Sequence, residues 1–519
     1  MSAVVDENQP PPQPVSNENT EGEKESQPTA ETQPVGETVV SEPKEKTTVS
    51  ESAEKPTPEK TKSVVIDELK PTEIEDPAED GRTQRRIIAE DPDWTLATVR
   101  MLNDLTLQYI SSNFEYACHV IDNLPATQRQ QVLDSLPTSL PLQLSSKLID
   151  DEGFWKRSCQ SKWSVCDVSP FENCWKRMYF EKVLEEQIEQ FTPGQSDMTP
   201  LLEMTELAAP FVRRLNIRQL LPPLSLPNNR GSNPPDDLVS DAVSEAEDEP
   251  DVDHFDFRVL IPKLPNLHSL TVTYSVQNCG VNFEWSLFQF TQKDVQALAK
   301  CIAAATQLQS IYIHRSRMDD DKCRLLISHI LNHPGLNFIS FPHNTIGDRG
   351  GRGIGKLLTS QCAIVELDLC DNRIGAVGAQ AIAHALTKNQ TLEKLNLRLN
   401  RLGDDGGQAI CKALTVNTTL KWLNLAANQL SEPTAALLAQ AFAVNNTVQI
   451  MDLSGNRLGP DGGKQLREGL EQNNAIIELD LRLTEVGQEA AYCIQQLLSR
   501  NKTLYVEKGQ SLPRPEVKL

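Results

Sequence analysis

The chain has 519 residues and a formal net charge of −22 at pH 7, from 50 basic and 72 acidic side chains. This acidic balance argues against nucleic acid as the main partner. No run approaches 18 uninterrupted apolar residues, and the first residues have neither the basic region nor the apolar run of a signal peptide, so we expect no membrane span and no membrane partner.

Residues 1–85 contain eleven prolines and no Phe, Trp or Tyr. A segment with so little apolar surface cannot offset the conformational entropy that it would lose on ordering. We therefore expect residues 1–85 to form a disordered tail.

Residues 90–225 have a different composition, because they include Trp94, Trp155, Trp163 and Trp175 out of six tryptophans in the chain. Apolar side chains recur there at helical spacing, and prolines interrupt them. This pattern predicts an all-α domain of about five or six helices.

An acidic linker is predicted at residues 226–254. Nine of the eighteen residues from Asp236 to Asp253 are acidic. Charge repulsion and the lack of apolar side chains favour an open chain there.

Residues 255–519 are dominated by a 28-residue unit that occurs seven times. Its pattern is L-x-x-L-x-L-x-x-N-x-L-G-x-x-G, which is typical of a long leucine-rich repeat. Each copy opens with an apolar residue, and these are Leu308, Leu336, Ile364, Leu392, Leu420, Val448 and Ile476. Leu504 stands where an eighth copy would open.

Each unit is predicted to contain one strand and one helix. Apolar and polar residues alternate in Leu423-Asn424-Leu425, which places one face of a strand in the core. Apolar residues four apart, such as Ile382 and Leu386, predict the buried face of a helix. One unit cannot bury both elements, so the units must stack into an α/β horseshoe with the strands on its inner surface.

An asparagine and a glycine mark the turn from strand to helix. The asparagines, which we expect to satisfy backbone groups inside the stack, are Asn344, Asn372, Asn400, Asn428 and Asn456. The glycines, which we expect to allow a tight turn, are Gly347, Gly375, Gly403, Gly459 and Gly487. Ser316 replaces the asparagine in the first regular unit and Thr484 in the last, as expected of atypical end units.

A looser unit begins at Leu267 and reaches Leu308 after 41 residues (308 − 267), which exceeds the 28-residue period by 13. The extra residues include Phe283, Trp285, Phe288 and Phe290, so we expect them to fold against the open end of the array.

The residues between the core positions of each strand form the inner surface of the horseshoe, where repeat arrays usually bind partners. Phe338, Trp422 and Ile450 are apolar there, and exposed aromatics among charges are typical of an interface hot spot. The predicted partner-binding residues on this concave face are Tyr312, Phe338, Glu366, Asp368, Lys394, Trp422, Ile450, Asp452, Glu478 and Asp480.

One segment, from Gly350 to Leu357, approaches the phosphate-binding pattern G-x-x-x-x-G-K-[S/T]. Leu357 stands where a hydroxyl would be needed to hold magnesium, and the repeat already accounts for the glycines. We interpret this match as a coincidence.

No nucleophile–base pair and no H-E-x-x-H motif is identifiable among the eight histidines. Cys159, Cys166 and Cys174 lack the paired spacing of a zinc site, and the eleven cysteines are expected to be reduced thiols. We therefore expect a protein that is not an enzyme, with no catalytic residue, cofactor, metal or small-molecule substrate.

The helical region permits a second interpretation. Leu124-Pro125, the apolar helices after it and Phe154-Trp155 resemble an F-box-like helical trio. An F-box followed by leucine-rich repeats is the layout of ubiquitin-ligase substrate receptors. The same pattern also fits any small helical domain with helices bounded by prolines.

Three features together are more specific: W-K-R-x-C-x-x-K-W from Trp155 to Trp163, N-C-W-K-R-M-Y-F-E from Asn173 to Glu181, and the 28-residue repeats. From about residue 90 onward the chain resembles the leucine-rich-repeat subunits of the nexin–dynein regulatory complex of cilia and sperm flagella. The resemblance implies a structural subunit on the axonemal doublet microtubule, with other subunits of that complex and doublet components as partners. It implies no catalytic residue.

The repeats alone also resemble those of ribonuclease inhibitor and of the GTPase-activating protein for Ran. A regulator of a GTPase is therefore a further alternative. Those proteins share the array but not the helical region, and no catalytic residue matches by motif.

Overall fold

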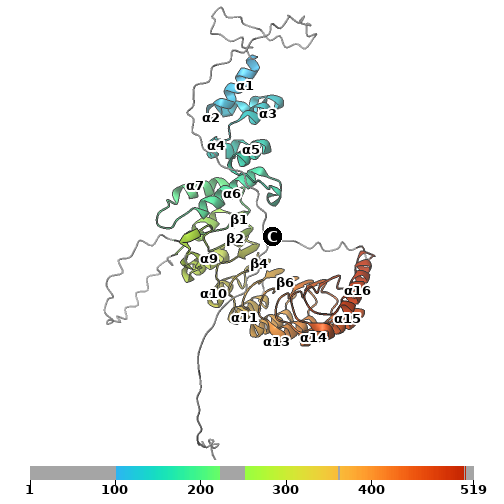
Figure 1. The fold of residues 1–519 in the computed structure, drawn as a ribbon. Helices are drawn as coiled ribbons and strands as arrows, with labels where there is room; N and C mark the ends of the chain where they lie inside the picture. The colour runs from blue at the N-terminus through green and yellow to red at the C-terminus, as the bar shows by residue number, and fades with distance from the viewer. Residues whose placement is uncertain (1–100, 223–251, 284, 361–362, 508, 510–519) are drawn as a thin grey trace, which may run out of the picture. The chain divides into compact units, whose positions relative to one another are not determined.

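In the residues that the structure describes, nine parallel strands form one sheet, and their order in the sheet follows their order in the chain (Figure 1). This computed structural model describes residues 101–222, 252–283, 285–360, 363–507 and 509. The predicted tail and most of the predicted acidic linker lie outside these ranges. The strands are β1 (Arg214–Ile217), β2 (Ser269–Val272), β3 (Ser310–Ile313), β4 (Phe338–Ser340), β5 (Glu366–Asp368), β6 (Lys394–Asn396), β7 (Trp422–Asn424), β8 (Ile450–Asp452) and β9 (Glu478–Asp480).

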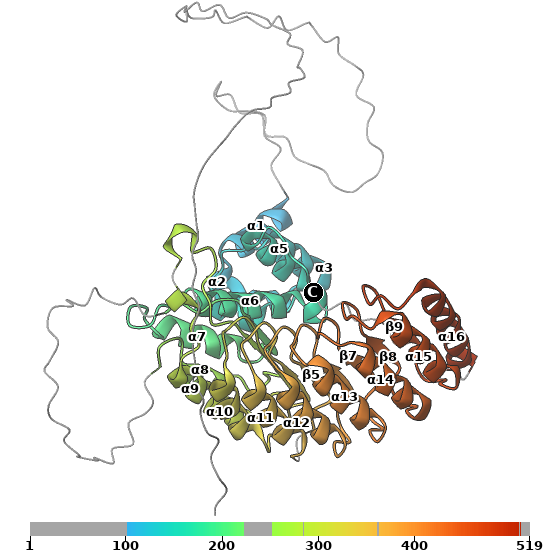
Figure 2. The same cartoon turned by 60° about the horizontal axis from the view of Figure 1, so that its bottom comes forward.

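After β2, strands alternate with helices that lie side by side along one face of the sheet (Figure 2). The predicted core positions are buried, as at Ile382 and Leu386, so the predicted α/β leucine-rich-repeat fold is confirmed. These helices are α9 (Gln292–Ala304), α10 (Asp320–Ile330), α11 (Asp348–Leu358), α12 (Ala376–Leu386), α13 (Gly403–Leu414), α14 (Glu432–Val444), α15 (Gly459–Glu471) and α16 (Gln488–Glu507). None of the described helices is long and apolar enough to cross a membrane.

In the helical region before the sheet, the indole of Trp155 is buried against Tyr179 and Phe180, and its Nε1 donates to the carbonyl of Ile149 at 2.8 Å. Strand β1 also lies in this range, which the sequence predicted to be entirely helical. The prediction was wrong there because only Leu215 and Ile217 carry the alternating pattern, which is too short to recognise. The helices are α1 (Leu102–Ser112), α2 (Phe114–Ala117), α3 (Ala126–Ser135), α4 (Leu142–Leu148), α5 (Glu152–Lys162), α6 (Trp175–Glu189) and α7 (Thr199–Ala208), and the short α8 (Phe257–Leu260) precedes β2.

Helix α6 covers the edge of the sheet at β1. Glu181, Glu185 and Glu189 follow one another at intervals of one turn, so they share a face of α6. Each Oε1 accepts from backbone N–H groups at β1: Arg213 and Arg214 for Glu181 (2.8 and 3.1 Å), Asn216 for Glu185 (2.7 Å) and Arg218 for Glu189 (2.7 Å). The three carboxyl groups therefore satisfy donors that an edge strand would otherwise leave unpaired.

The predicted role of the turn asparagines is confirmed by their hydrogen bonds. Nδ2 of Asn400 donates to the carbonyls of Leu369 and Leu397 (2.9 and 3.0 Å), and its Oδ1 accepts from the N–H of Ile374 (3.1 Å). One side chain thus joins two successive units. In the first regular unit Ser316 takes a related role, because its hydroxyl accepts from the N–H of Tyr274 at 3.0 Å.

A second set of buried asparagines, which the sequence analysis missed, joins the units where each helix ends. Nδ2 of Asn445 donates to the carbonyls of Leu414 and Asn417 (2.8 and 3.0 Å). In an earlier unit His333 stands in the same register. Its Nε2 lies 3.1 Å from the carbonyl of Ala305, and its Nδ1 accepts from two backbone N–H groups. The other members of the set are Asn389, Asn417, Asn473 and Asn501.

The turn glycines fall into two groups. Gly347 and Gly375 have φ of −107° and −98°, and their N–H groups donate to Asp320 and Asp348 of the preceding helix (2.6 and 2.9 Å). The helix before Gly403 carries Ala376 at the position of Asp320 and Asp348. Gly403 instead has a left-handed φ of 58°. Gly459 and Gly487 are also left-handed, at 71° and 75°, and follow helices with Glu432 and Pro460 there. The tight-turn prediction thus holds only where no aspartate accepts from the turn.

Leu504, which stands where an eighth copy of the unit would open, does not begin a strand. Helix α16 runs through this residue and has 20 residues, whereas α10 to α15 have 11 to 13. A strand at this place would have only one neighbour, while a continued helix pairs its backbone groups internally. Within the described residues, the last elements of the array are therefore β9 and a long helix.

We expect Gly403→Ala to lower the free energy of unfolding by about 1–2 kcal/mol, because a Cβ is strained at this left-handed φ. An Ala376→Asp change would supply the acceptor that Asp348 supplies one unit earlier, and so would permit an extended turn. The penalty of Gly403→Ala should then shrink in the Ala376→Asp background. A double-mutant cycle measured by urea unfolding tests this, and an equal penalty in both backgrounds would contradict the rule.

Burial raises the pKa of the Glu185 carboxyl to about 8, from an ordinary value near 4.5. Since the folded-state pKa is the higher one, the stability that this group contributes is present below pH 4.5 and is lost as the pH rises through about 8. Glu185→Gln keeps an oxygen that can accept from Asn216 but removes the titration. Its free energy of unfolding should therefore decline less steeply than that of the wild type between about pH 5 and pH 8.

Urea unfolding at several pH values measures this decline, with Glu203→Gln, at an exposed site on α7, as the matched control. Parallel curves for the wild type and Glu185→Gln would contradict the prediction.

Candidate partner-binding face

The strands expose the residues that alternate with the buried core positions, so each strand contributes two side chains to one continuous face. Registered neighbours lie on adjacent strands, as Trp422 does beside Lys394 on one side and Ile450 on the other. All ten residues predicted for the concave face lie on β3 to β9 in these two rows. The repeat period alone brings them together.

Phe338 does not have the exposure that the hot-spot prediction assumed. Its side chain is 8% exposed, and its ring stacks on that of Tyr312 with 4.6 Å between centroids. Tyr312 also contacts the ring of His314 at 5.8 Å. The prediction was wrong for Phe338 because the strand pattern gives the direction of a side chain but not what covers it.

His314 belongs to this aromatic group and is half-buried. Burial lowers the pKa of its imidazole to about 4, so the ring is neutral near pH 7. The same burial makes His314 part of the packing around Tyr312 rather than a base open to solvent.

Trp422 and Ile450 are the apolar residues that remain accessible on the face, and both are half-buried. Charged side chains flank them: Lys394 forms an ion pair with Glu366 at 3.2 Å, and Glu478 is exposed. An apolar pair within a charged border is an arrangement found at the centre of protein interfaces.

Each aspartate of the face forms a hydrogen bond or ion pair with a different neighbouring side chain. Asp368 accepts from the hydroxyl of Ser340 (3.1 Å) and Asp452 from the amide of Asn424 (3.0 Å). Asp480 binds Arg482, which lowers the pKa of that carboxyl, whereas burial raises the pKa of Asp368. Each carboxyl group has its own neighbour, so the row does not supply a cooperating acid and base.

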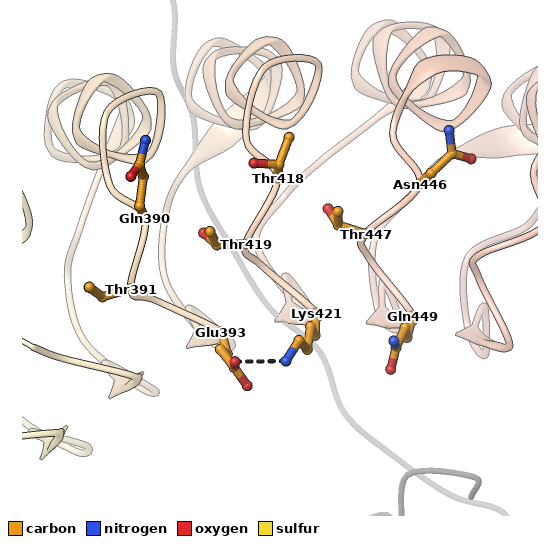
Figure 3. Close-up of a pocket in the computed structure, with 9 residues that line it drawn as sticks. All are labelled: Gln390, Thr391, Glu393, Thr418, Thr419, Lys421, Asn446, Thr447 and Gln449. Carbon is orange, nitrogen blue, oxygen red and sulfur yellow. Dashed lines mark hydrogen bonds and ion pairs between the residues drawn. The ribbon is translucent and has the colours of Figure 1, made fainter. Parts of the chain in front are cut away.

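A polar hollow of about 320 Å³ lies where the chain enters β6, β7 and β8 (Figure 3). Glu393 and Lys421 form an ion pair of 2.7 Å in it. The backbone N–H groups of Thr419 and Thr447 donate to Asn417 and Asn445 of the second asparagine set (3.1 and 3.0 Å). The hollow is therefore part of the turns that hold the units together. Its lining residues are Gln390, Thr391, Glu393, Thr418, Thr419, Lys421, Asn446, Thr447 and Gln449.

The glycine-rich segment from Gly350 to Leu357 has a packing role. It forms most of α11, and a Cβ on Gly351 would stand 2.9 Å from the Cα of Gly378, while one on Gly355 would stand 2.8 Å from the carbonyl oxygen of Ala381. These glycines permit the close approach of α11 and α12. This contact accounts for the glycines without a phosphate ligand.

The three neighbouring cysteines have separate contacts. The thiol of Cys159 is buried, which raises its pKa to about 12, while Cys174 lies against Glu152 with 3.2 Å between Sγ and Oε1. Among the residues that the structure describes, no group of three or more potential metal-binding side chains comes together.

Comparison with known proteins identifies a family model that matches some of the repeats and relatives that match about half of the chain. The Leucine Rich repeat family model matches residues 362–383, 388–411 and 444–466. Dynein regulatory complex subunit 5 of Mus musculus is 42% identical over 276 residues, which cover 53% of this chain and 54% of that protein. Dynein regulatory complex subunit 5 of Chlamydomonas reinhardtii is 32% identical over 225 residues, which cover 43% of this chain and 50% of that protein.

The chain thus spans about half the length of the relatives that it matches. Among solved structures, an internalin of Listeria monocytogenes is 18% identical with a TM-score of 0.29, over 46% of this chain and 68% of that one. That likeness is too low to carry an argument. The findings together give a leucine-rich-repeat chain with similarity to dynein regulatory complex subunit 5 from a mammal and a green alga.

Proposed function

We propose that this chain is a non-enzymatic scaffold subunit of the dynein regulatory complex in the axoneme of cilia and flagella. The observation that carries the proposal is the 42% identity with a protein named as subunit 5 of that complex. The finer resemblance, in the tryptophan-rich segments and the repeats, is to the T-complex-associated testis-expressed protein 1. On this proposal the chain helps to link doublet microtubules and to regulate dynein-driven motility, in sperm among other cells.

The fold supports a scaffold in two ways. Buried asparagines tie each unit to the next, so the exposed strand face is held in a fixed shape before any partner binds. Three of its aspartates, Asp368, Asp452 and Asp480, are each bound to a neighbouring side chain, which suits a surface for recognition better than one for acid–base chemistry. The partners we propose are other subunits of the complex and doublet components.

On the concave face we propose that Trp422 and Ile450 form the centre of the contact. Tyr312, Glu366, Asp368, Lys394, Asp452, Glu478 and Asp480 surround this centre on the same two rows. Phe338 packs beside Tyr312 on this face through ring stacking.

If the proposal is right, a tagged chain expressed in ciliated cells will remain on detergent-washed axonemes and will be released by salt together with dynein regulatory complex subunits. Mass spectrometry of the salt extract identifies what is released with it. Recovery only in the detergent-soluble fraction, with ubiquitin-ligase core subunits or a GTPase as the companions, would replace the proposal with one of the alternatives.

The concave contact has its own test in the double variant Trp422→Ala/Ile450→Ala. We expect its retention on axonemes to fall by roughly tenfold or more, because truncating a central aromatic residue typically removes 2 kcal/mol or more of binding energy. The control is Val377→Ala/Val416→Ala, which removes apolar side chains exposed at 41% and 61% outside the strand rows. Equal retention of both variants, each with wild-type thermal stability, would place the contact elsewhere on the molecule.

A further inference from the structure

Exposed arginines recur along the edge of the array at which the strands end. One turn position, repeated every 28 residues, holds Arg317, Thr345, Arg373, Arg401, Gln429, Arg457 and Glu485. The N–H of Arg401 donates to the carbonyl of Ile374 at 2.9 Å. This hydrogen bond places Arg401 beside Arg373 of the preceding unit. Arg315 and Arg398 lie in the same turns. We call Arg315, Arg373, Arg398, Arg401 and Arg457 the arginine ridge.

All five side chains of the arginine ridge are exposed, and none forms an ion pair with another residue in the described part of the chain. Several carboxylates of the same units are engaged elsewhere. Asp348 accepts from the N–H groups of Gly375 and Gly378, Asp404 from Ser431, Asp371 pairs with His343, and Asp480 pairs with Arg482. The five arginines of the ridge therefore have no ion-pair partner among the described residues.

The chain has a net charge of −22, so a strip of exposed arginines differs in sign from the protein as a whole. At physiological salt, charges more than about 8 Å apart are largely screened, so a bound segment experiences mainly the local arginines. Exposed arginines on a repeat protein are often only solvated. Here, however, Arg373, Arg401 and Arg457 take the same turn position in three units, two of them successive, and Arg315 and Arg398 lie in the same row of turns.

We propose that the arginine ridge binds an extended acidic segment of a second polypeptide. From β3 to β8 the ridge crosses five strand spacings, or about 24 Å, which an extended segment of about eight residues can follow. The guanidinium group donates in a planar fork that matches a carboxylate, which favours arginine over lysine for this contact. The proposal concerns a different surface from the concave face and does not depend on the proposed function.

The chain carries an acidic segment of its own, since nine of the residues from Asp236 to Asp253 are acidic. The stretch of chain that contains this segment joins residue 222, after β1, to residue 252, before α8, and both of these lie at the start of the array. To follow the ridge as far as Arg457 it would have to run out and turn back. The ridge therefore fits a separate polypeptide better.

Fluorescence anisotropy of a labelled glutamate-rich peptide of about twelve residues, titrated with the full chain at about 100 mM salt, tests the proposal. The triple variant Arg373→Gln/Arg401→Gln/Arg457→Gln should bind about tenfold more weakly, because several charge pairs are lost together. The matched control, Arg352→Gln/Lys356→Gln/Lys412→Gln, removes three exposed positive charges from α11 and α13 and should bind within about twofold of the wild type. Circular dichroism melts should show all variants folded, because the changed side chains are exposed.

If the two triple variants bind the peptide equally weakly, the proposal is overturned. Peptide binding would then depend only on the total charge of the chain. A further variant, with the nine acidic residues of Asp236 to Asp253 replaced by Asn or Gln, reports on the chain's own segment. If this variant binds the peptide much more tightly than the wild type, the ridge is occupied from within the chain and the claim of a second polypeptide fails. If neither the wild type nor this variant binds the peptide, the proposal is also overturned. Failure of the axonemal retention experiment would contradict the proposed function and would leave this proposal unaffected.

Discussion

The array depends on pairing the backbone groups that its turns would otherwise bury without a partner. An unpaired buried amide or carbonyl costs about 1–3 kcal/mol, and every unit creates several. Asn400 and Asn445 show the two solutions, one at each end of the helix, and each reaches into the preceding unit. Because these side chains span units, an insertion or deletion within a regular unit would separate donor from acceptor. This accounts for the strict spacing of 28 residues.

The same requirement explains the ends of the sheet. At β1 the free N–H groups are satisfied by Glu181, Glu185 and Glu189 of α6, so the helical region is an integral cover of the first strand rather than a separate body joined by a flexible segment. At the other end α16 extends past the last strand and uses Asn501 to reach the carbonyls of Asn473 and Ile476 (2.9 and 2.8 Å). Carboxyl groups of a helix thus close the first end of the array, whereas the last end uses an asparagine of the set that joins the interior units.

Much of this fold could be predicted from the sequence because its period is regular. The period fixes which residues are core, such as Ile382 and Leu386, and which share the exposed face, such as Trp422 and Ile450. It could not predict features that depend on a neighbour in space. The burial of Phe338 depends on the orientation of Tyr312, and the conformation of Gly403 depends on the absence of an aspartate at Ala376. His333 was missed because an imidazole there does the work of an amide, which no pattern based on residue type would recognise.

Several conspicuous groups have a structural role, and this distinguishes them from the two candidate binding surfaces. Gly351 and Gly355 are required for helix contact, Thr419 and Thr447 lie in turns held by buried asparagines, and Asp348 holds the turn at Gly375. Each of these groups could be mistaken for a site if viewed alone. By contrast, the side chains of Trp422, Ile450 and the arginine ridge form no hydrogen bond or ion pair within the described residues. They also occupy different parts of the same units, so changes to one leave the other intact and the two surfaces can be dissected independently.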